Sequence, residues 1–356
     1  MKIIHKYIIE EIKMPIIFGI SIFTFVFIIE IIVTMMESII VKGISLIDII
    51  RMLSFYLPPI LSQTIPMGMF LGIMLTFSKF TRTSESTAMY ASGLDLKTIL
   101  KPIVCLSVVV TLFIFFLQES IIPRSFSKLQ YLTTKIAYEN PVFNLKDKTF
   151  IDEVDKYNLY IDRIDKKTNI AGGVLVFQND EKAKYPTVLI GNEAYWKESS
   201  MIITNSIFYT YDETGKETLR GDFDNKKIPL TAYFDDIDIK IKDIEAMSIN
   251  MMLDEMKKLN KKEKIPYKVE IQRKLALPLS TIMLGILGVL LSIGHHRSWK
   301  GTSYSLCLGI IFAYIVILNM GMVLASREKI PIFLGIWTPN VILLILTFYM
   351  YKYRNR

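Results

Sequence analysis

Six long apolar segments alternate with polar ones along this chain, three before and three after a central polar region. The segments cover residues 14–36, 53–77, 103–122, 275–293, 303–324 and 332–350. A helix of about 20 apolar residues crosses the hydrocarbon core of a bilayer, and a helix satisfies all its backbone polar groups internally. The pattern predicts a polytopic α-helical membrane protein with six transmembrane helices, arranged three plus three.

The central region, residues 123–274, has a different pattern. Residues 124–139 favour a helix that continues the third span, and short alternating or β-branched runs follow at 158–164, 173–177, 187–196 and 201–211. Such runs, separated by turn-forming clusters, are typical of strands. We expect an inserted all-β domain, a jelly roll or sandwich, with helical connectors; the second connector is lysine-rich (250–264).

The first thirteen residues predict an amphipathic helix lying at the membrane surface, because isoleucines alternate with charged residues. The expected organisation is then an interfacial helix (1–13), three spans (14–122) with a short helix in the loop at about 83–93, the β domain (123–274), and three spans with a tail (275–356).

Charge gives the orientation. The 42 basic and 34 acidic residues leave a net charge of +8, which in a membrane protein indicates cytoplasmic loops and anionic headgroups, with no sign of nucleic-acid binding. Basic residues gather at the N-terminus, in the loops after spans two and four, and in the tail, whereas the opposite loops hold only Lys42, Arg51, Arg327 and Lys329. Both termini are predicted to be cytoplasmic and the β domain to lie outside.

The chain offers little for catalysis. It has no glycine-rich loop ending in Gly-Lys-Ser/Thr, and its histidines (His5, His295 and His296) suit neither a triad nor a zinc site. Cys105 and Cys307 fall inside spans, where they suit apolar packing. No enzyme activity, cofactor or metal is expected in this chain.

Glu30 lies within the first apolar segment, and Glu37 follows seven residues later on about the same helical face. A carboxylate at membrane depth costs several kcal/mol unless it is paired, protonated or hydrated. Glu30 is therefore expected to face a cavity or another subunit; the alternative is that it reaches the interface.

The second span carries Pro58, Pro59 and Pro66, followed by Gly68 and Gly72. Proline kinks a helix, and small residues let a second backbone approach closely. This combination fits packing within one subunit and a laterally opening gate equally.

The loop after the second span predicts a short helix: Thr83, Ser84 and Glu85 supply a cap, and Gly93 supplies the end. The helix is expected to expose Met89 and Tyr90. Docking of a soluble partner and anchoring at the interface both fit this pattern.

Several motifs stand out by their order and spacing along the chain. They are Lys2-Ile3-Ile4-His5-Lys6-Tyr7, Leu57-Pro58-Pro59 with Ile65-Pro66-Met67-Gly68, Ser84 to Gly93, Glu270-Ile271-Gln272-Arg273-Lys274 to Leu279, Gly309 to Gly321, and Trp337-Thr338-Pro339-Asn340. Together they resemble the LptF/LptG family, the permease subunits of the lipopolysaccharide export machine. The resemblance covers essentially the whole chain.

The resemblance implies a permease of an ABC transporter in the bacterial inner membrane, extracting lipopolysaccharide and passing it through a periplasmic jelly roll. It implies a paralogous permease partner (an F/G pair), a cytoplasmic LptB dimer holding ATP and magnesium, LptC, and the bridge protein LptA. It further implies ATPase coupling through Ser84, Glu85, Met89 and Gly93, and lipid phosphates near Lys42 and Arg51.

The chain also departs from the family. Lysines often line the outer part of the first span in relatives, whereas this chain has Glu30 and Glu37 there. Glu30 is hypothesised to pair with a basic residue of the other subunit or to reach phosphate through a divalent ion. A secondary transporter and a membrane sensor or assembly scaffold are the rival classes, and the choice between F-like and G-like stays open.

Overall fold

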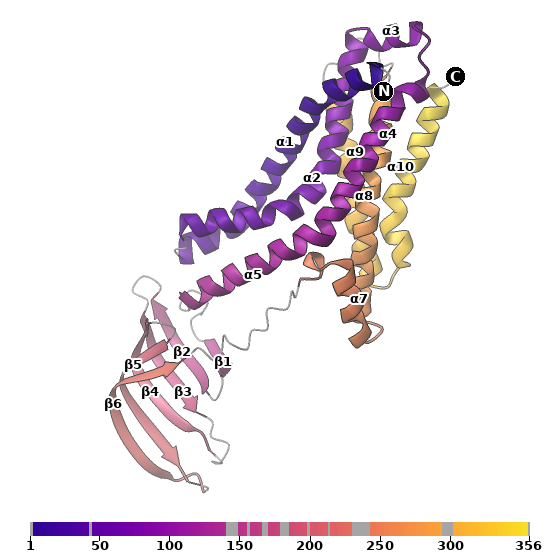
Figure 1. Cartoon of the computed structure of the whole chain (residues 1–356). Helices are drawn as coiled ribbons and strands as arrows, with labels where there is room; N and C mark the ends of the chain where they lie inside the picture. Colours follow the sequence, from indigo (N-terminus) through magenta and orange to yellow (C-terminus); the bar gives the residue numbers. More distant parts are fainter. Residues whose placement is uncertain are drawn as a thin grey trace. The chain divides into compact units, whose positions relative to one another are not determined.

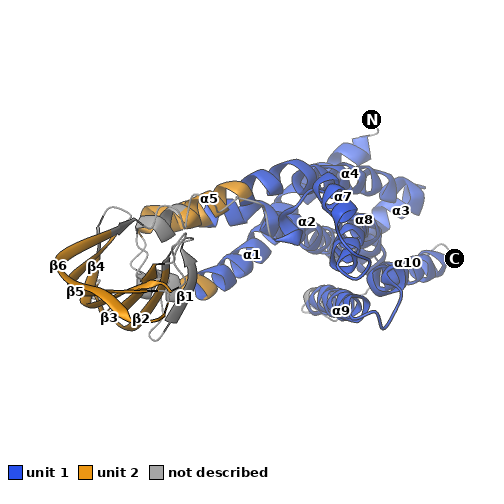
Figure 2. Cartoon of the chain, turned by 90° about the horizontal axis from the view of Figure 1, so that it is seen from below, with its two compact units in different colours: residues 1–33, 53–126, 241–356 blue, residues 34–52, 127–240 orange. Residues whose placement is uncertain are grey.

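The computed structural model describes residues 3–42, 45–139, 149–154, 157–165, 170–178, 185–197, 200–212, 214–229, 243–293 and 302–354. The chain forms two compact units, coloured in Figure 2. The first, which we call the helical unit, comprises residues 1–33, 53–126 and 241–356, and the second comprises residues 34–52 and 127–240.

Long helices dominate the chain (Figure 1). They are α1 (Ile3–Lys42), α2 (Leu46–Arg82), α4 (Leu96–Phe116), α5 (Ile122–Glu139), α8 (Lys264–Ser292), α9 (Thr302–Ser326) and α10 (Ile332–Arg354). A π-helical turn, η1 (Leu117–Ile121), joins α4 to α5 without a break. Within the described ranges, six helical stretches are long and apolar enough to span a membrane, counting α4 to α5 as one. The predicted six spans are confirmed.

The helices extend past the apolar segments at several ends. The helix expected at 124–139 is present as α5, and α8 begins at Lys264, before the apolar segment. Residues 3–13 form the start of α1, and Ile8 and Ile12 there are fully buried in the protein. The apolar side of this segment therefore packs against other helices of the chain at these two positions.

The helical unit has its core between α2, α4 and α8. Phe70, Phe77 and Phe80 of α2 are fully buried. The helix α2 continues through Pro58, Pro59 and Pro66, which remain inside its bounds. Close backbone contact holds α1 to α2: a Cβ atom on Gly72 would lie 2.5 Å from the Ile16 Cα. Small residues permit this approach because no side chain separates the two backbones.

Short elements complete the helical unit. They are α3 (Glu85–Ala91), the single-turn η3 (Ile244–Ala246) and α7 (Ile249–Lys258). We call residues 243–258, which contain η3 and α7, the connector, because they lead from the β strands back to α8.

The second unit contains one antiparallel sheet whose strands neighbour one another in sequence order. The strands are β1 (Thr149–Val154), β2 (Tyr157–Asp165), β3 (Ile170–Gln178), β4 (Thr187–Lys197), β5 (Ser200–Tyr211) and β6 (Glu217–Pro229). One face is apolar and buried, with Ile161, Val174 and Ile203 fully buried, as the period of two in the sequence predicts.

The all-β prediction is confirmed, and the four expected strands correspond to β2, β3, β4 and β5. The arrangement differs in detail: the described strands form a single six-stranded meander, whereas a jelly roll divides its strands between two sheets. Each of these strands pairs antiparallel with the next one along the chain, so neighbours in sequence are adjacent in the sheet.

Candidate functional site

The short helix α3 lies where the sequence places it, with a different cap. Ser84 occupies the N-cap position in a left-handed conformation (φ 61°), and its side chain makes no capping hydrogen bond. The expectation that Ser84 caps the helix is therefore wrong, because a left-handed residue does not aim its hydroxyl at the first N–H groups. Gly93, with φ 79°, ends the turn after α3 as predicted.

Glu85 is held by two hydroxyl groups. The Tyr7 hydroxyl donates to Glu85 Oε2 at 2.7 Å, and the Thr83 hydroxyl donates to Glu85 Oε1 at 2.7 Å. These hydrogen bonds, the one from Tyr7 first, lower the pKa of the Glu85 carboxyl. The Tyr7 ring stacks on Phe80 at 5.6 Å. The start of α1 thus fixes the orientation of α3.

The inner face of α3 is buried. Ser86 and Met89 point into the protein, and Met89 belongs to an apolar cluster that joins α1, α2, α4 and α8. The expected exposure of Met89 is wrong, because this side chain fills the core beneath α3. Tyr90 is exposed as expected, and so are Thr87, Ala88 and Ala91.

The bond between Tyr7 and Glu85 predicts a pH-dependent contribution to stability. Glu85 has its pKa lowered in the folded chain from 4.5, so its contribution is present above pH 4.5 and is lost as the pH falls through the lower folded value. We expect Tyr7→Phe to lower the free energy of unfolding by about 1 kcal/mol or less at neutral pH. The difference from the wild type should become smaller at a pH well below 4.5, where the carboxyl of Glu85 takes up its proton.

Thermal unfolding of the detergent-purified protein at both pH values is the measurement. Tyr131→Phe is the matched control, because Tyr131 is 63% exposed. A Tyr7→Phe deficit that is the same at both pH values would refute the ionised Glu85 as the acceptor.

The remaining predicted site residues belong to α1 and α2. Glu30 is exposed on the surface of α1. Glu37 and Lys42 belong to the C-terminal part of α1, and their side chains lie outside the described residues. Arg51 pairs with Asp48 one turn away on α2, Nη1 to Oδ1 at 3.2 Å. His295 and His296 fall outside the described residues.

A polar cluster that the sequence analysis did not assign secures the connector to the spans. Glu119, in η1, accepts hydrogen bonds from the backbone N–H of Ile249 at 2.9 Å and of Asn250 at 3.5 Å, at the start of α7. A carboxylate suits a helix N-terminus, where N–H groups lack partners inside the helix. Ser248 caps the same helix through the N–H of Met251.

Two basic residues of α8 complete this cluster. Lys274 is 3% exposed and its ammonium donates to the backbone carbonyl of Met247. Arg273 makes a two-pronged contact with Glu270, at 2.7 and 2.8 Å, and lies 3.6 Å from Glu245. A buried charge is tolerated only when paired and hydrogen-bonded. In the sequence, a sign of this cluster is that the acidic Glu119 lies within an apolar segment.

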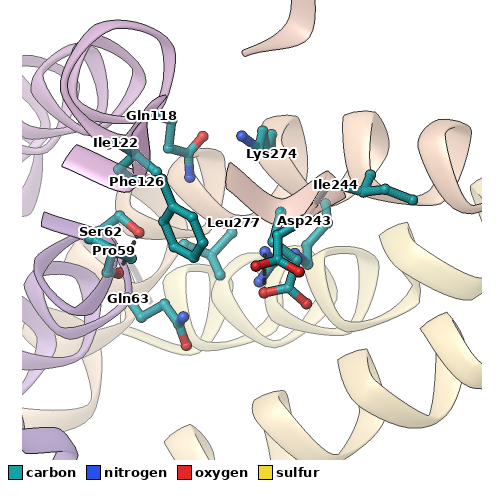
Figure 3. Close-up of a pocket in the computed structure, with 12 residues that line it drawn as sticks. Pro59, Ser62, Gln63, Gln118, Ile122, Phe126, Asp243, Ile244, Lys274 and Leu277 are labelled. Atoms are coloured by element: carbon teal, nitrogen blue, oxygen red, sulfur yellow. Dashed lines mark hydrogen bonds and ion pairs between the residues drawn. The ribbon is translucent and has the colours of Figure 1, made fainter. Parts of the chain in front are cut away.

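A cavity of about 260 Å³ opens beside this cluster (Figure 3). Its walls come from α2, from η1 and α5, from the connector and from α8, all within the helical unit. Pro59 lies in the wall, so one of the predicted kink residues borders the cavity.

Two motifs that carry the family resemblance contact each other between α8 and α10. The Trp337 indole donates to Gln272 Oε1 at 2.8 Å, and the Asn340 amide donates to the Ala276 carbonyl at 2.8 Å. Asn340 is 1% exposed, so this bond is shielded from solvent. The motifs therefore join the first and last helices of the C-terminal half.

Six spanning helices and a separate antiparallel sheet define a multi-pass membrane protein with an inserted β domain. The family model of the lipopolysaccharide export system permease LptF/LptG matches residues 6–353. The chain belongs to this family, whose members are transport components. No curated protein matches the chain.

Proposed function

We propose that this chain is the membrane-embedded permease subunit of an ABC transporter that takes lipopolysaccharide from the inner membrane and passes it to its own β domain. The observation that carries the proposal is the family match over residues 6–353, on a chain with six spans and a β domain. A separate ATPase supplies the energy, so ATP and magnesium belong to that partner and the chain needs no cofactor of its own.

The orientation follows from the basic residues. Lys6, Lys13, Lys79 and Arg82 lie in the first turns of α1 and the last turns of α2, at the end of the helical unit that carries α3. This end faces the cytoplasm in the proposal, because cytoplasmic loops attract basic residues. Glu119 comes 23 residues after the start of α4, and a helix of 23 residues is about 35 Å long. In this proposal the helix therefore crosses the membrane between the start of α4 and Glu119. The connector and the β domain are then on the periplasmic side.

The ATPase docks on α3. The exposed Thr87, Ala88 and Ala91 form a surface of small side chains that lets a partner approach the helix closely. Glu85 keeps α3 in position through Tyr7, and Met89 transmits movement of α3 to the cluster shared by four other helices. Ser84 and Gly93, both with positive φ, fix the two ends of α3.

The second permease subunit and the lipid contact the surface of α1. Phe18, Phe25, Val26, Ile29 and Val33 are apolar and 44–64% exposed. Large apolar surfaces of this kind suit acyl chains and a second subunit.

Lys42 and Arg51 reach lipid phosphates in this proposal, with Arg51 exchanging its pairing with Asp48. Glu30 and Glu37 pair with the partner subunit, and the prolines of α2 lend the gate its flexibility. LptC and LptA receive the lipid from the β domain.

Affinity purification of the tagged full chain from native membranes tests this function. We expect an ATPase, a paralogous permease and lipopolysaccharide to co-purify with the chain, and the ATPase activity of the complex to need magnesium. Purification of the chain without any ATPase, in a detergent that keeps it folded, would contradict the proposal and favour a secondary transporter or a sensor.

A further inference from the structure

Both apolar and polar side chains line the cavity beside the connector. Pro59, Ile122, Phe126 and Leu277 are among the apolar ones. Figure 3 shows Gln118, Phe126 and Asp243 approaching the space from η1, from α5 and from the connector. A space lined by both kinds of side chain suits the junction between a lipid headgroup and its chain, where polar and apolar groups adjoin.

The two cations in the wall already have partners. Arg273 directs Nε and Nη2 to Glu270, and the Lys274 ammonium donates to the Met247 carbonyl. Arg273 is thus paired with a carboxylate and Lys274 is held by a backbone carbonyl, so neither cation is left without a partner in the wall.

Some polar residues of the lining have hydrogen-bond acceptors left over. Gln118 is 7% exposed, and its buried Oε1 has no hydrogen-bond partner among the described residues. The Asp243 side chain is exposed, and the Glu245 side chain is 75% exposed and 3.6 Å from Arg273. A buried acceptor without a donor costs about 1–3 kcal/mol, so the Gln118 amide favours a ligand that donates hydrogen bonds.

We propose that this cavity binds the primary ammonium of a zwitterionic phospholipid headgroup of the ethanolamine type. The ammonium carries three N–H donors and a positive charge, which match the Gln118 amide oxygen and the two connector carboxylates. The carbons next to the headgroup contact Phe126 and Leu277. This site binds a bilayer lipid, and it does not depend on the proposed export of lipopolysaccharide.

Lipid retention by the purified full chain tests the proposal. Phosphatidylethanolamine, phosphatidylcholine and phosphatidylglycerol with identical acyl chains are added in detergent, and bound lipid is counted by native mass spectrometry. Phosphatidylcholine keeps the positive charge but has no N–H donor, and phosphatidylglycerol has no ammonium. We expect phosphatidylethanolamine to be retained about tenfold more than either, as a charge-assisted hydrogen bond implies.

The double variant Asp243→Asn with Glu245→Gln is expected to lose this preference while the other two lipids bind as before. The matched control is Asp254→Asn with Glu255→Gln on α7, where both carboxylates already pair with Lys257 and Lys258 away from the cavity. Thermal unfolding of both variants confirms that they are folded.

Equal retention of the three lipids, or a preference that survives in the double variant, would overturn the proposal. Displacement of phosphatidylethanolamine by lipopolysaccharide at equal concentration would also overturn it, because the occupant would then be a glycolipid. ATP-driven lipopolysaccharide release is measured separately on the same variants, so failure of the headgroup site leaves the export function untouched.

Discussion

Replacing Gly68 by alanine is expected to separate α1 from α2. A Cβ atom at this position would lie 2.6 Å from the Ile20 Cα and closer still to the Ile20 backbone nitrogen. Backbone atoms do not move aside by changing rotamer, so the helices must shift apart. We expect a loss of about 2 kcal/mol in the free energy of unfolding, even though alanine favours a helix over glycine by about 1 kcal/mol.

Gly309→Ala is the matched control for this prediction. Gly309 also lies inside a spanning helix, and a Cβ there meets nothing within 4 Å, so alanine is expected to be neutral or stabilising. Thermal unfolding in detergent, with disulfide trapping of cysteines placed on α1 and α2, reports the separation. Equal melting temperatures for the two variants would refute the close packing of α1 on α2.

Reversing the charge of Glu85 is expected to release the ATPase. Glu85→Arg breaks the hydrogen bonds from Tyr7 and Thr83 and brings a cation close to Lys79, which already contributes to the lowered pKa of Glu85. The helix α3 then loses its orientation on the end of α1. We expect at least about tenfold less ATPase to co-purify, since loss of a charged partner costs about 2 kcal/mol or more.

Glu10→Arg is the control, because Glu10 is an exposed carboxylate on α1 near the same end of the unit and pairs with Lys6 at 3.9 Å. Glu85→Gln is the second variant: it keeps the shape of the side chain and is expected to give an intermediate loss. ATPase recovery from Glu85→Arg equal to that from Glu10→Arg, with both proteins folded, would contradict the role of α3.

The spans were predictable because hydrophobic length alone defines them. The apolar segments form helices, and only Ile293 falls one residue beyond the end of α8. The continuation of the third span as α5 was predicted, whereas the start of α8 was not, because polar residues continue that helix before its apolar segment. Strands β2 to β5 were predictable from alternation. The last strand, β6, was not, because its exposed sequence, with Arg220, Asp222 and Lys226, has no apolar face to signal a strand.

The candidate sites were less predictable, since they depend on contacts between distant segments. The sequence around Met89 predicts an exposed residue in a polar loop. Met89 is buried because α3 packs on four other helices. Glu119 meets the connector 130 residues later in the chain. Nothing in the local sequence around Glu119 indicates that its carboxylate holds the start of α7.

Transfer of lipopolysaccharide to the β domain is the central claim, and photo-crosslinking tests it most directly. A photo-reactive residue at Leu189, on the buried apolar face of β4, and another at its neighbour Ile190, on the opposite face, are placed in complexes reconstituted in proteoliposomes. The account predicts a lipopolysaccharide adduct at residue 189 that requires ATP hydrolysis and exceeds the adduct at residue 190. Absence of any ATP-dependent adduct at either position, in complexes that hydrolyse ATP, would contradict the account.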